Sequence, residues 1–243
     1  MSKTERIAGV MGGLGPEATV DFMARVLALT PAERDQDHIH LLVDQNPGVP
    51  NRQDAILRGA EDPAPALAAM ARRLESAGAD FVVMPCNAAH AFQPAIESAL
   101  DIPFVSIVDV TVDALGDHAR GTVGLMATPA GIEAGTYQAA MRATHGGDAS
   151  LLVFDDDERE SFMSLVYAIK AGDRGADVAA GMRRLANALV ARGAGALIAG
   201  CTEIPLALSP EDIDVPLIVS TDELARRTIE LARGERALPE PKT

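Results

Sequence analysis

GADFVVMPCNAAH (78–90) and GAGALIAGCTEIP (193–205) are two copies of one pattern, and together they decide the fold. In each copy a glycine precedes an apolar run that is typical of a buried strand, and the run ends at a cysteine, Cys86 or Cys201. Cys201 stands 115 residues after Cys86, which is the size of a domain. The pattern therefore predicts a duplicated unit.

The repeat extends beyond the two cysteines. Gly124 stands 115 residues after Gly9, and DVPLIVS (214–220) repeats DIPFVSI (101–107) at nearly the same offset. Apolar runs alternate with stretches of helical periodicity, as in parallel sheets with right-handed crossovers. We predict strands within 6–11, 37–47, 81–85, 102–107, 121–131, 151–154, 197–200 and 214–220, and helices within 21–29, 66–78, 89–100, 161–173, 178–193 and 222–234.

The predicted fold class is α/β, with two pseudo-symmetric lobes that each hold a short parallel sheet flanked by helices. We expect an N-terminal lobe over residues 1–108 and a C-terminal lobe over 109–220, and a C-terminal helix in 221–243 that packs back on the first lobe. In this prediction the last helix has no counterpart in the repeat. Ligands bind beyond the carboxyl ends of parallel strands, so we expect the active site in the cleft between the lobes.

Composition and charge narrow the class of protein. The chain has 243 residues, 48% of them hydrophobic, and no run of 18 apolar residues, which is typical of a soluble globular protein. Its formal net charge of −14 argues against nucleic acid or a membrane as a partner, because both attract basic surfaces. The opening residues do not resemble a secretory leader, so we expect a cytoplasmic location, where both cysteines stay thiols.

Two matched thiols suit one kind of chemistry. We expect each cysteine at a helix N-terminus, whose partial positive charge makes a thiol easier to ionise. Inverting a carbon centre that bears a hydrogen requires a base on one face and an acid on the other, and a thiolate with a thiol supplies both. The unperturbed thiol pKa of about 8.5 already lies near working pH. Cys86 and Cys201 are therefore candidate acid/base residues.

Four stretches resemble signatures of the cofactor-independent aspartate/glutamate racemases, and they are MGGLGPEAT (11–19), NPGVPNR (46–52), PCNAAH (85–90) and GCTEIP (200–205). The resemblance covers nearly the whole chain. It implies an amino acid as the substrate, two cysteines that transfer a proton at Cα, and a cleft between two α/β domains. It also implies no pyridoxal phosphate, no metal and a homodimer.

Residue roles follow from this resemblance. Cys86 and Cys201 become the acid/base pair, and Arg52 becomes the clamp for a side-chain carboxylate, to which a guanidinium can donate two parallel hydrogen bonds. Lys170 resembles a second cationic ligand. The substrate-binding residues that the resemblance implies are Met11, Gly12, Arg52, Asn87, Thr128, Lys170 and Thr202.

Two positions depart from the family pattern. Residue 88 is Ala where the family usually has Thr, and Gly131 stands where a hydroxyl residue is usual in the turn that begins at Thr128. Both changes remove hydroxyl donors that we expect to face the substrate. Because a site built around a hydrogen bond discriminates strongly, we expect glutamate or a wider range of amino acids as substrates.

Glu203 and His90 are candidates for supporting roles. Glu203 either orients the nearby Cys201 or interacts only with a helix dipole. His90 follows Cys86 by four residues, a spacing that suits zinc, but no second Cys/His pair completes a site. We therefore expect His90 in the core or behind the active site. The GGLG turn lacks the G-x-G-x-x-G spacing of dinucleotide-binding turns, so no nucleotide cofactor is expected.

Other functions fit the same scaffold. The nearest enzymatic alternatives are cis-trans isomerisation of a dicarboxylate and decarboxylation of a malonate, although the two cysteines favour racemisation. A two-lobed protein that closes on a ligand without chemistry would need neither cysteine. A redox dithiol would need its sulfurs at disulfide distance, whereas a racemase holds a carbon between them.

Overall fold

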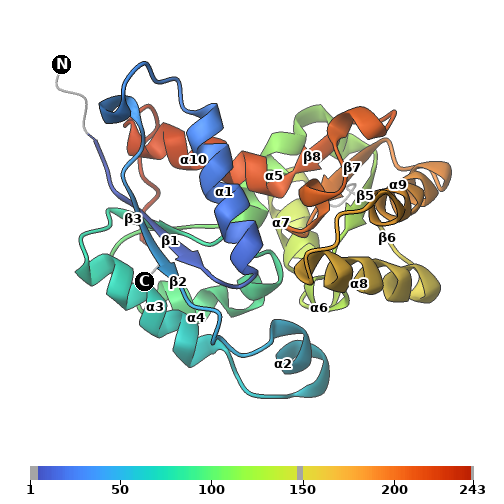
Figure 1. Ribbon diagram of the computed structural model, residues 1–243, viewed down its shortest axis with the longest axis horizontal. Coiled ribbons are helices and arrows are strands. Elements are labelled where there is room, and N and C mark those ends of the chain that lie inside the picture. The colour runs from blue at the N-terminus through green and yellow to red at the C-terminus, as the bar shows by residue number, and fades with distance from the viewer. Residues whose placement is uncertain (1–4, 147–149, 242–243) are drawn as a thin grey trace.

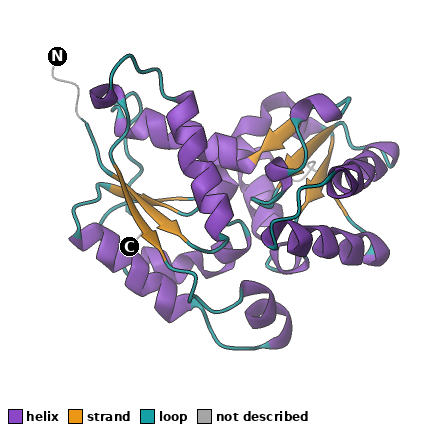
Figure 2. Ribbon diagram, viewed as in Figure 1, coloured by secondary structure: helices purple, strands orange, loops and turns teal. Residues whose placement is uncertain are grey.

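The computed structural model describes residues 5–146 and 150–241 and is α/β, with two separate parallel sheets surrounded by helices (Figures 1 and 2). The strand orders β2-β1-β3-β4 and β6-β5-β7-β8 are the same order repeated. The strands are β1 (Ala8–Gly12), β2 (Leu41–Gln45), β3 (Phe81–Val83), β4 (Phe104–Val105), β5 (Thr122–Met126), β6 (Ser150–Val153), β7 (Ala196–Ala199) and β8 (Leu217–Val219). The predicted duplication of the α/β unit is thus confirmed in the sheets.

Helices connect these strands as crossovers. The α-helices are α1 (Pro16–Leu29), α2 (Arg52–Arg58), α3 (Ala64–Ser76), α4 (Gln93–Glu97), α5 (Ile107–Leu115), α6 (Pro129–Glu133), α7 (Thr136–His145), α8 (Asp156–Lys170), α9 (Ala176–Ala191) and α10 (Ser220–Ala232). The 3-10 turns are η1 (Asp35–Asp37), η2 (Ala88–Phe92), η3 (Gly116–Arg120), η4 (Ile204–Leu206) and η5 (Pro210–Asp212). The continuous helix predicted over 89–100 is wrong, because η2 precedes α4 and Pro94 lies in the first turn of α4. No helix in the described ranges is long and apolar enough to cross a membrane.

Two glycines at equivalent places explain how closely strands and helices pack. Gly9 in β1 and Gly124 in β5 each face a leucine and an alanine, which are Leu74 and Ala79 for Gly9 and Leu189 and Ala194 for Gly124. A Cβ added at either glycine would come within 3.0–3.2 Å of the Cβ atoms of these neighbours. A larger residue would push the helix off the sheet, so the repeated glycine preserves one packing solution in both lobes.

The last helix has a counterpart after all. α10 follows β8 as α5 follows β4, and the two helices pack against each other between the sheets (Figure 1). α10 also packs against α1, while α5 packs against α7, so each helix contacts the lobe opposite its own preceding strand. The prediction of an unmatched last helix is wrong because α5, with the sequence IVDVTVDAL, follows β4 directly and is rich in β-branched residues, so it was not recognised as a helix from the sequence.

The exchanged helices give the two lobes a common hydrophobic core. One cluster of buried side chains joins Val10 in β1, Val123 in β5 and residues of α5 and α10. The opposite face of each sheet packs into a core of its own, against α3 in one lobe and α9 in the other. A buried apolar seam of this kind holds the carboxyl ends of both sheets in a defined position around the cleft.

Candidate active site

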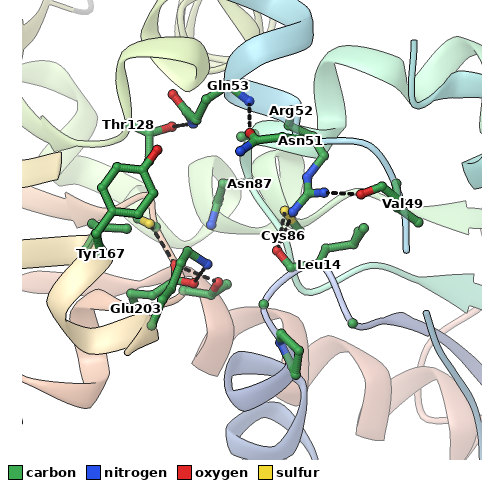
Figure 3. Close-up of a pocket in the computed structure, with 18 of the residues that line it drawn as sticks. Leu14, Val49, Asn51, Arg52, Gln53, Cys86, Asn87, Thr128, Tyr167 and Glu203 are labelled. Atoms are coloured by element: carbon green, nitrogen blue, oxygen red, sulfur yellow. Dashed lines mark hydrogen bonds and ion pairs between the residues drawn. The ribbon is translucent and has the colours of Figure 1, made fainter. Parts of the chain in front are cut away.

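The pocket lies between the lobes at the carboxyl ends of the central strands, and its volume is about 320 Å³ (Figure 3). Its lining includes eight of the residues singled out in the sequence, which are Arg52, Cys86, Asn87, Thr128, Lys170, Cys201, Thr202 and Glu203. Pockets for small ligands start at about 300 Å³, so this one suits a small molecule. The fold therefore assembles one cleft from residues spread over most of the chain.

Both cysteines reach this pocket as free thiols. Cys86 follows β3 in one lobe and Cys201 follows β7 in the other. Their exposed fractions are nearly equal, 8% for Cys86 and 7% for Cys201. Two thiols thus enter one cavity from opposite lobes with the same degree of burial.

The expected effect of a helix N-terminus on the thiols is wrong. Neither cysteine begins an α-helix, since the next elements are the short 3-10 turns η2 and η4. A macrodipole needs several aligned peptide units. Instead, burial raises the pKa of Cys201 well above its usual value, and the negative charge of Glu203 raises it further.

Glu203 is the direct partner of Cys201. The Cys201 Sγ donates a hydrogen bond to Glu203 Oε2 at 3.0 Å, and the Thr202 hydroxyl donates to the same oxygen at 3.4 Å. The other oxygen, Oε1, forms an ion pair with Lys170 Nζ. Burial is the largest single influence on the pKa of Lys170 and lowers it, but the charge and hydrogen bond of Glu203, together with the two cysteines, raise it by more, so the net pKa is raised and Lys170 is charged. Glu203 therefore does contact its cysteine and does more than complement a helix end.

Gly15 lets the first lobe close over this ion pair. A Cβ added at Gly15 would lie 2.8 Å from Glu203 Oε1 and 3.2 Å from Lys170 Nζ. Any side chain there would collide with both groups. The glycine turn is thus shaped for contact with a charged pair from the other lobe, which explains its sequence better than nucleotide binding does.

Arg52 is placed by its own loop. Its Nη1 donates to the carbonyls of Val49 at 3.1 Å and Pro50 at 2.9 Å, and its Nη2 donates to the carbonyl of Leu14 at 2.7 Å. These bonds use three of the five guanidinium N–H donors. Within residues 5–146 and 150–241 the structure gives Arg52 no acidic partner. Two donors and the positive charge therefore remain for an anionic ligand.

Asn87 connects three elements at the floor of the pocket. Its Nδ2 donates to Ser220 Oγ at 3.1 Å, and its Oδ1 accepts from the Tyr137 hydroxyl at 2.7 Å. Ser220 Oγ in turn donates to the Ala199 carbonyl at 2.7 Å. The Asn87 side chain therefore ties β3 to α7 and α10, and one Nδ2 hydrogen is left for a ligand.

Gln53 bridges the lobes at the rim, and the sequence argument missed it. Its Nε2 donates to Thr128 Oγ1 at 2.7 Å, and its Oε1 accepts from the Ala130 N–H at 3.1 Å. Asn51 caps α2 through the N–H of Gln53, which fixes the first turn. The sequence signal that could have identified Gln53 is its position directly after Arg52, in the first turn of a helix that Asn51 caps.

Met11 and Gly12 do not line the pocket. Met11 is fully buried in the core on the far face of its sheet, and a Cβ on Gly12 would lie 2.5 Å from Thr19 Cγ2. The glycine turn reaches the pocket later, at 13–16. Strand alternation explains the difference, because successive side chains of β1 point to opposite faces. The predicted substrate contacts of Met11 and Gly12 therefore have no geometric basis.

His90 supports Cys86 from behind. Its Nδ1 lies 2.8 Å from the Cys86 carbonyl, and its Nε2 accepts the N–H of Ile107 at 3.1 Å, so Nδ1 carries the proton. Burial lowers the pKa of His90 to about 4, and the ring is neutral. In the described residues no group of three or more His, Cys, Asp and Glu side chains could hold a metal ion.

The two departures from the family pattern have different positions. Ala88 lines the pocket, whereas Gly131 lies within α6 and its N–H donates to Thr128 Oγ1 at 3.3 Å. Gly131 is not among the residues that line the pocket, and our expectation that residue 131 faces the substrate stays a prediction. Helix α8 adds an apolar wall that the sequence argument did not identify, formed by Met163, Val166 and Tyr167.

Two α/β lobes that present paired thiols to one interlobe pocket define a class of protein suited to acid/base chemistry on a small substrate. The chain belongs to the Asp/Glu/Hydantoin racemase family, whose model matches residues 11–228, and it is therefore an isomerase. It is 27% identical over 225 residues to "Broad specificity amino-acid racemase RacX" of Bacillus subtilis (strain 168), which covers 91% of this chain and 96% of the relative.

Solved structures show the same fold. "Picrophilus torridus aspartate racemase" superposes with a TM-score of 0.84 at 27% identity and covers 96% of each chain. Glutamate racemase from Francisella tularensis subsp. tularensis SCHU S4, in complex with D-glutamate, has a TM-score of 0.68 at 19% identity and covers 98% of this chain and 85% of that one. The predicted two-lobed α/β fold is confirmed by these likenesses.

Proposed function

We propose that Cys86 and Cys201 racemise an amino acid by exchanging the proton on Cα. The observation that carries the proposal is the entry of two equally buried thiols into one small pocket from opposite lobes. A thiolate on one side removes the Cα proton, and the thiol on the other side delivers a proton to the opposite face. Arg52, with two free donors, binds a substrate carboxylate.

The substrate range follows from the walls of the pocket. Ala88 offers no hydroxyl group, and the α8 wall of Met163, Val166 and Tyr167 offers mainly apolar surface. We therefore propose a broad amino-acid racemase that takes glutamate and also neutral side chains. The relative RacX, whose name describes broad specificity, supports this choice.

Chiral chromatography of the common amino acids after incubation with the enzyme tests the function. The expected result is racemisation of several substrates together with incorporation of deuterium at Cα in heavy water. Ala88→Thr should shift the preference towards aspartate and glutamate, because it restores a hydroxyl donor. No turnover, with ligand binding unchanged in a Cys86→Ala/Cys201→Ala variant, would favour a non-catalytic binding protein. Turnover of maleate alone would favour a dicarboxylate isomerase.

Cofactor independence is part of the proposal. Two thiols, a guanidinium and an ion pair supply acid/base chemistry and charge binding without a further group. We expect full activity after treatment with a chelator and with hydroxylamine, which removes pyridoxal phosphate. Loss of activity that added metal or pyridoxal phosphate restores would contradict cofactor independence and leave the racemase assignment standing.

We also infer a homodimer. The exposed residues of α1 are all uncharged and mostly apolar, and they are Pro16, Val20, Met23, Ala24, Leu27 and Ala28. A stripe of this kind is suited to pairing with a second copy. Light scattering should give twice the chain mass, and Val20→Glu with Leu27→Lys should give a monomer. A monomeric wild type would exclude this interface.

We infer a cytoplasmic location, because free thiols at an active site need a reducing compartment. Fractionation of the native cells, followed by detection of the protein in each fraction, tests this inference.

A further inference from the structure

We propose that the two thiols are electrically unequal in the free enzyme. Cys86 ionises first and is the base that meets the incoming substrate, while Glu203 is a positioning residue that keeps the proton on Cys201. This inference rests on the proposed racemisation and assigns the starting role of each thiol. It is not a consequence of the fold, since duplication alone would make the two sites alike.

The surroundings of Cys201 oppose a negative sulfur. Its Sγ lies 3.0 Å from Glu203 Oε2, in a site where both side chains are buried. Removing the thiol proton would place two anions at this distance with a single cation, Lys170, shared between them. Tyr137, which interacts electrostatically with Cys201, is buried with a raised pKa and is neutral, so it adds no charge beside the sulfur.

The charges around Cys86 have the opposite sign. The Cys86 thiol donates a weak hydrogen bond to the Leu14 carbonyl oxygen at 3.9 Å, and the same oxygen accepts a hydrogen bond from the Arg52 guanidinium at 2.7 Å, so a cation lies one carbonyl group away from the sulfur. Figure 3 labels Arg52, Cys86 and Leu14, and the Leu14 carbonyl is the shared partner of the guanidinium and the sulfur. Lys170 also acts on Cys86 electrostatically, and His90 behind it is neutral. The charges nearest to Cys86 are therefore positive.

Burial does not account for this difference, because the exposed fractions of the two cysteines are 8% and 7%. Solvent exposure therefore does not distinguish the two thiols. What remains is the sign of the neighbouring charge, which is positive for Cys86 and negative for Cys201. The asymmetry thus depends on Arg52 and on Glu203, whose equivalent in the first copy of the repeat is the uncharged Ala88.

The order of proton movements follows. The Cys86 thiolate takes the Cα proton of the enantiomer whose hydrogen faces it, and the electron pair of the broken C–H bond stays on the substrate. That pair then takes the proton of Cys201, which forms a C–H bond on the opposite face. The enzyme is left with a Cys86 thiol and a Cys201 thiolate beside Glu203. Proton exchange with water or reaction of the other enantiomer restores the resting form.

Steady-state efficiency cannot reveal this asymmetry. Enantiomers have the same free energy in water, so kcat/KM must be equal in the two directions. The difference lies in the protonation of the free enzyme, and the measurement has to be made on the thiols themselves.

Alkylation of the full-length enzyme with limiting iodoacetamide, without substrate, tests the proposal. The label at each cysteine is counted by peptide mass spectrometry. A separation of one pKa unit corresponds to about a tenfold difference in thiolate fraction, so we expect Cys86 to be labelled at least about tenfold faster. Equal labelling, or faster labelling of Cys201, would overturn the proposal, because the equal exposure of the two thiols removes access as an explanation.

Glu203→Gln isolates the positioning residue. The amide keeps the shape of the side chain but removes its charge, so labelling of Cys201 should accelerate and the ratio should fall towards one. Glu17→Gln is the matched control, since Glu17 forms an ion pair across the lobes with Arg174 and does not line the pocket. A ratio that is unchanged in Glu203→Gln, or lowered equally in Glu17→Gln, would refute the role of Glu203.

Single-cysteine variants give an independent measurement. The ultraviolet absorbance of the thiolate, followed against pH, should titrate Cys201 in Cys86→Ser at a higher pH than Cys86 in Cys201→Ser. The reverse order would overturn the proposal. Neither labelling nor titration needs turnover, so a wild type that racemises nothing would refute the proposed function while the asymmetry is still measured.

Discussion

The two lobes are alike where they hold the thiols and different where they surround the substrate. β3 and β7 deliver Cys86 and Cys201 in the same way. The segment between the second strand and the next long helix differs, because it holds the short α2 in the first lobe and the long α8 in the second. α2 supplies polar groups, whereas α8 supplies an apolar wall and Lys170. Duplication thus preserved the reactive atoms, and the unmatched helices set charge and specificity.

Among the substitutions that test this comparison of the lobes, removal of either thiol is expected to cause the largest loss of activity. Cys86→Ser and Cys201→Ser should each lower kcat for racemisation by about 10²–10⁴-fold, because serine is a much weaker acid. Each variant keeps one thiol, so each should still exchange the α-hydrogen of one enantiomer with deuterium from the solvent, and the two variants should choose opposite enantiomers. Exchange of the same enantiomer by both would show that the thiols do not face each other.

Low pH is expected to destabilise the first lobe through His90. The equivalent residue of the second lobe is Pro205, which does not titrate. The pKa of His90 is lowered to about 4 by burial, below the usual value of about 6.5. The folded state therefore resists a proton that the unfolded state accepts, and stability falls as pH drops from about 6.5 to 4, by up to about 3 kcal/mol.

Denaturant unfolding at several pH values measures this loss. His90→Gln should flatten the decline, because glutamine does not titrate. His118→Gln changes an exposed histidine and should leave the wild-type slope. A His90→Gln variant that declines as steeply as the wild type would assign the acid sensitivity to other groups.

Substitution of Arg52 in α2 should lower catalytic efficiency more than substitution of Tyr167 in the apolar α8 wall. Arg52→Met removes the one cation of the described pocket that has no acidic partner, so kcat/KM should fall by about 10–100-fold, the value of one or two charge-assisted hydrogen bonds. Arg52→Lys should recover part of this loss. Tyr167→Ala should alter the relative rates of large and small substrates by only a few-fold, since Tyr167 is half exposed at the pocket. A larger effect for Tyr167→Ala than for Arg52→Met would show that the apolar α8 wall contributes more to substrate binding than Arg52 does.

The contact between the lobes is tested at Gly15. Gly15→Ala places a methyl group 2.8 Å from Glu203 Oε1, so the ion pair must shift, and we expect a destabilisation of about 1–3 kcal/mol. Gly121→Ala is the control, because its nearest neighbour would be 3.8 Å away. Denaturant unfolding of both variants measures the difference. Equal stability of the two would mean that Gly15 is tolerant of side chains.

Much of the fold was predictable because its signals are local. The apolar runs before Cys86 and Cys201 and the repeated glycines identify the strands and the duplication. Helix α5 was not predicted because it begins two residues after the short strand β4 and is rich in β-branched residues, which are typical of strands. Met11 was misplaced for a related reason, since a motif names residues while strand alternation decides which face each one occupies.

The sequence by itself determined the two lobes, the pair of thiols and the family to which the chain belongs, because strand periodicity and short motifs depend only on neighbours along the chain. Only the tertiary structure decided which distant charged groups lie around the thiols. The pairing of Lys170 with Glu203, the hydrogen bond of Arg52 to the Leu14 carbonyl that Cys86 also contacts, and the Gln53 bridge to Thr128 depend on how segments far apart in the sequence meet. Electrostatic effects depend on distance in space, and that distance is set by packing.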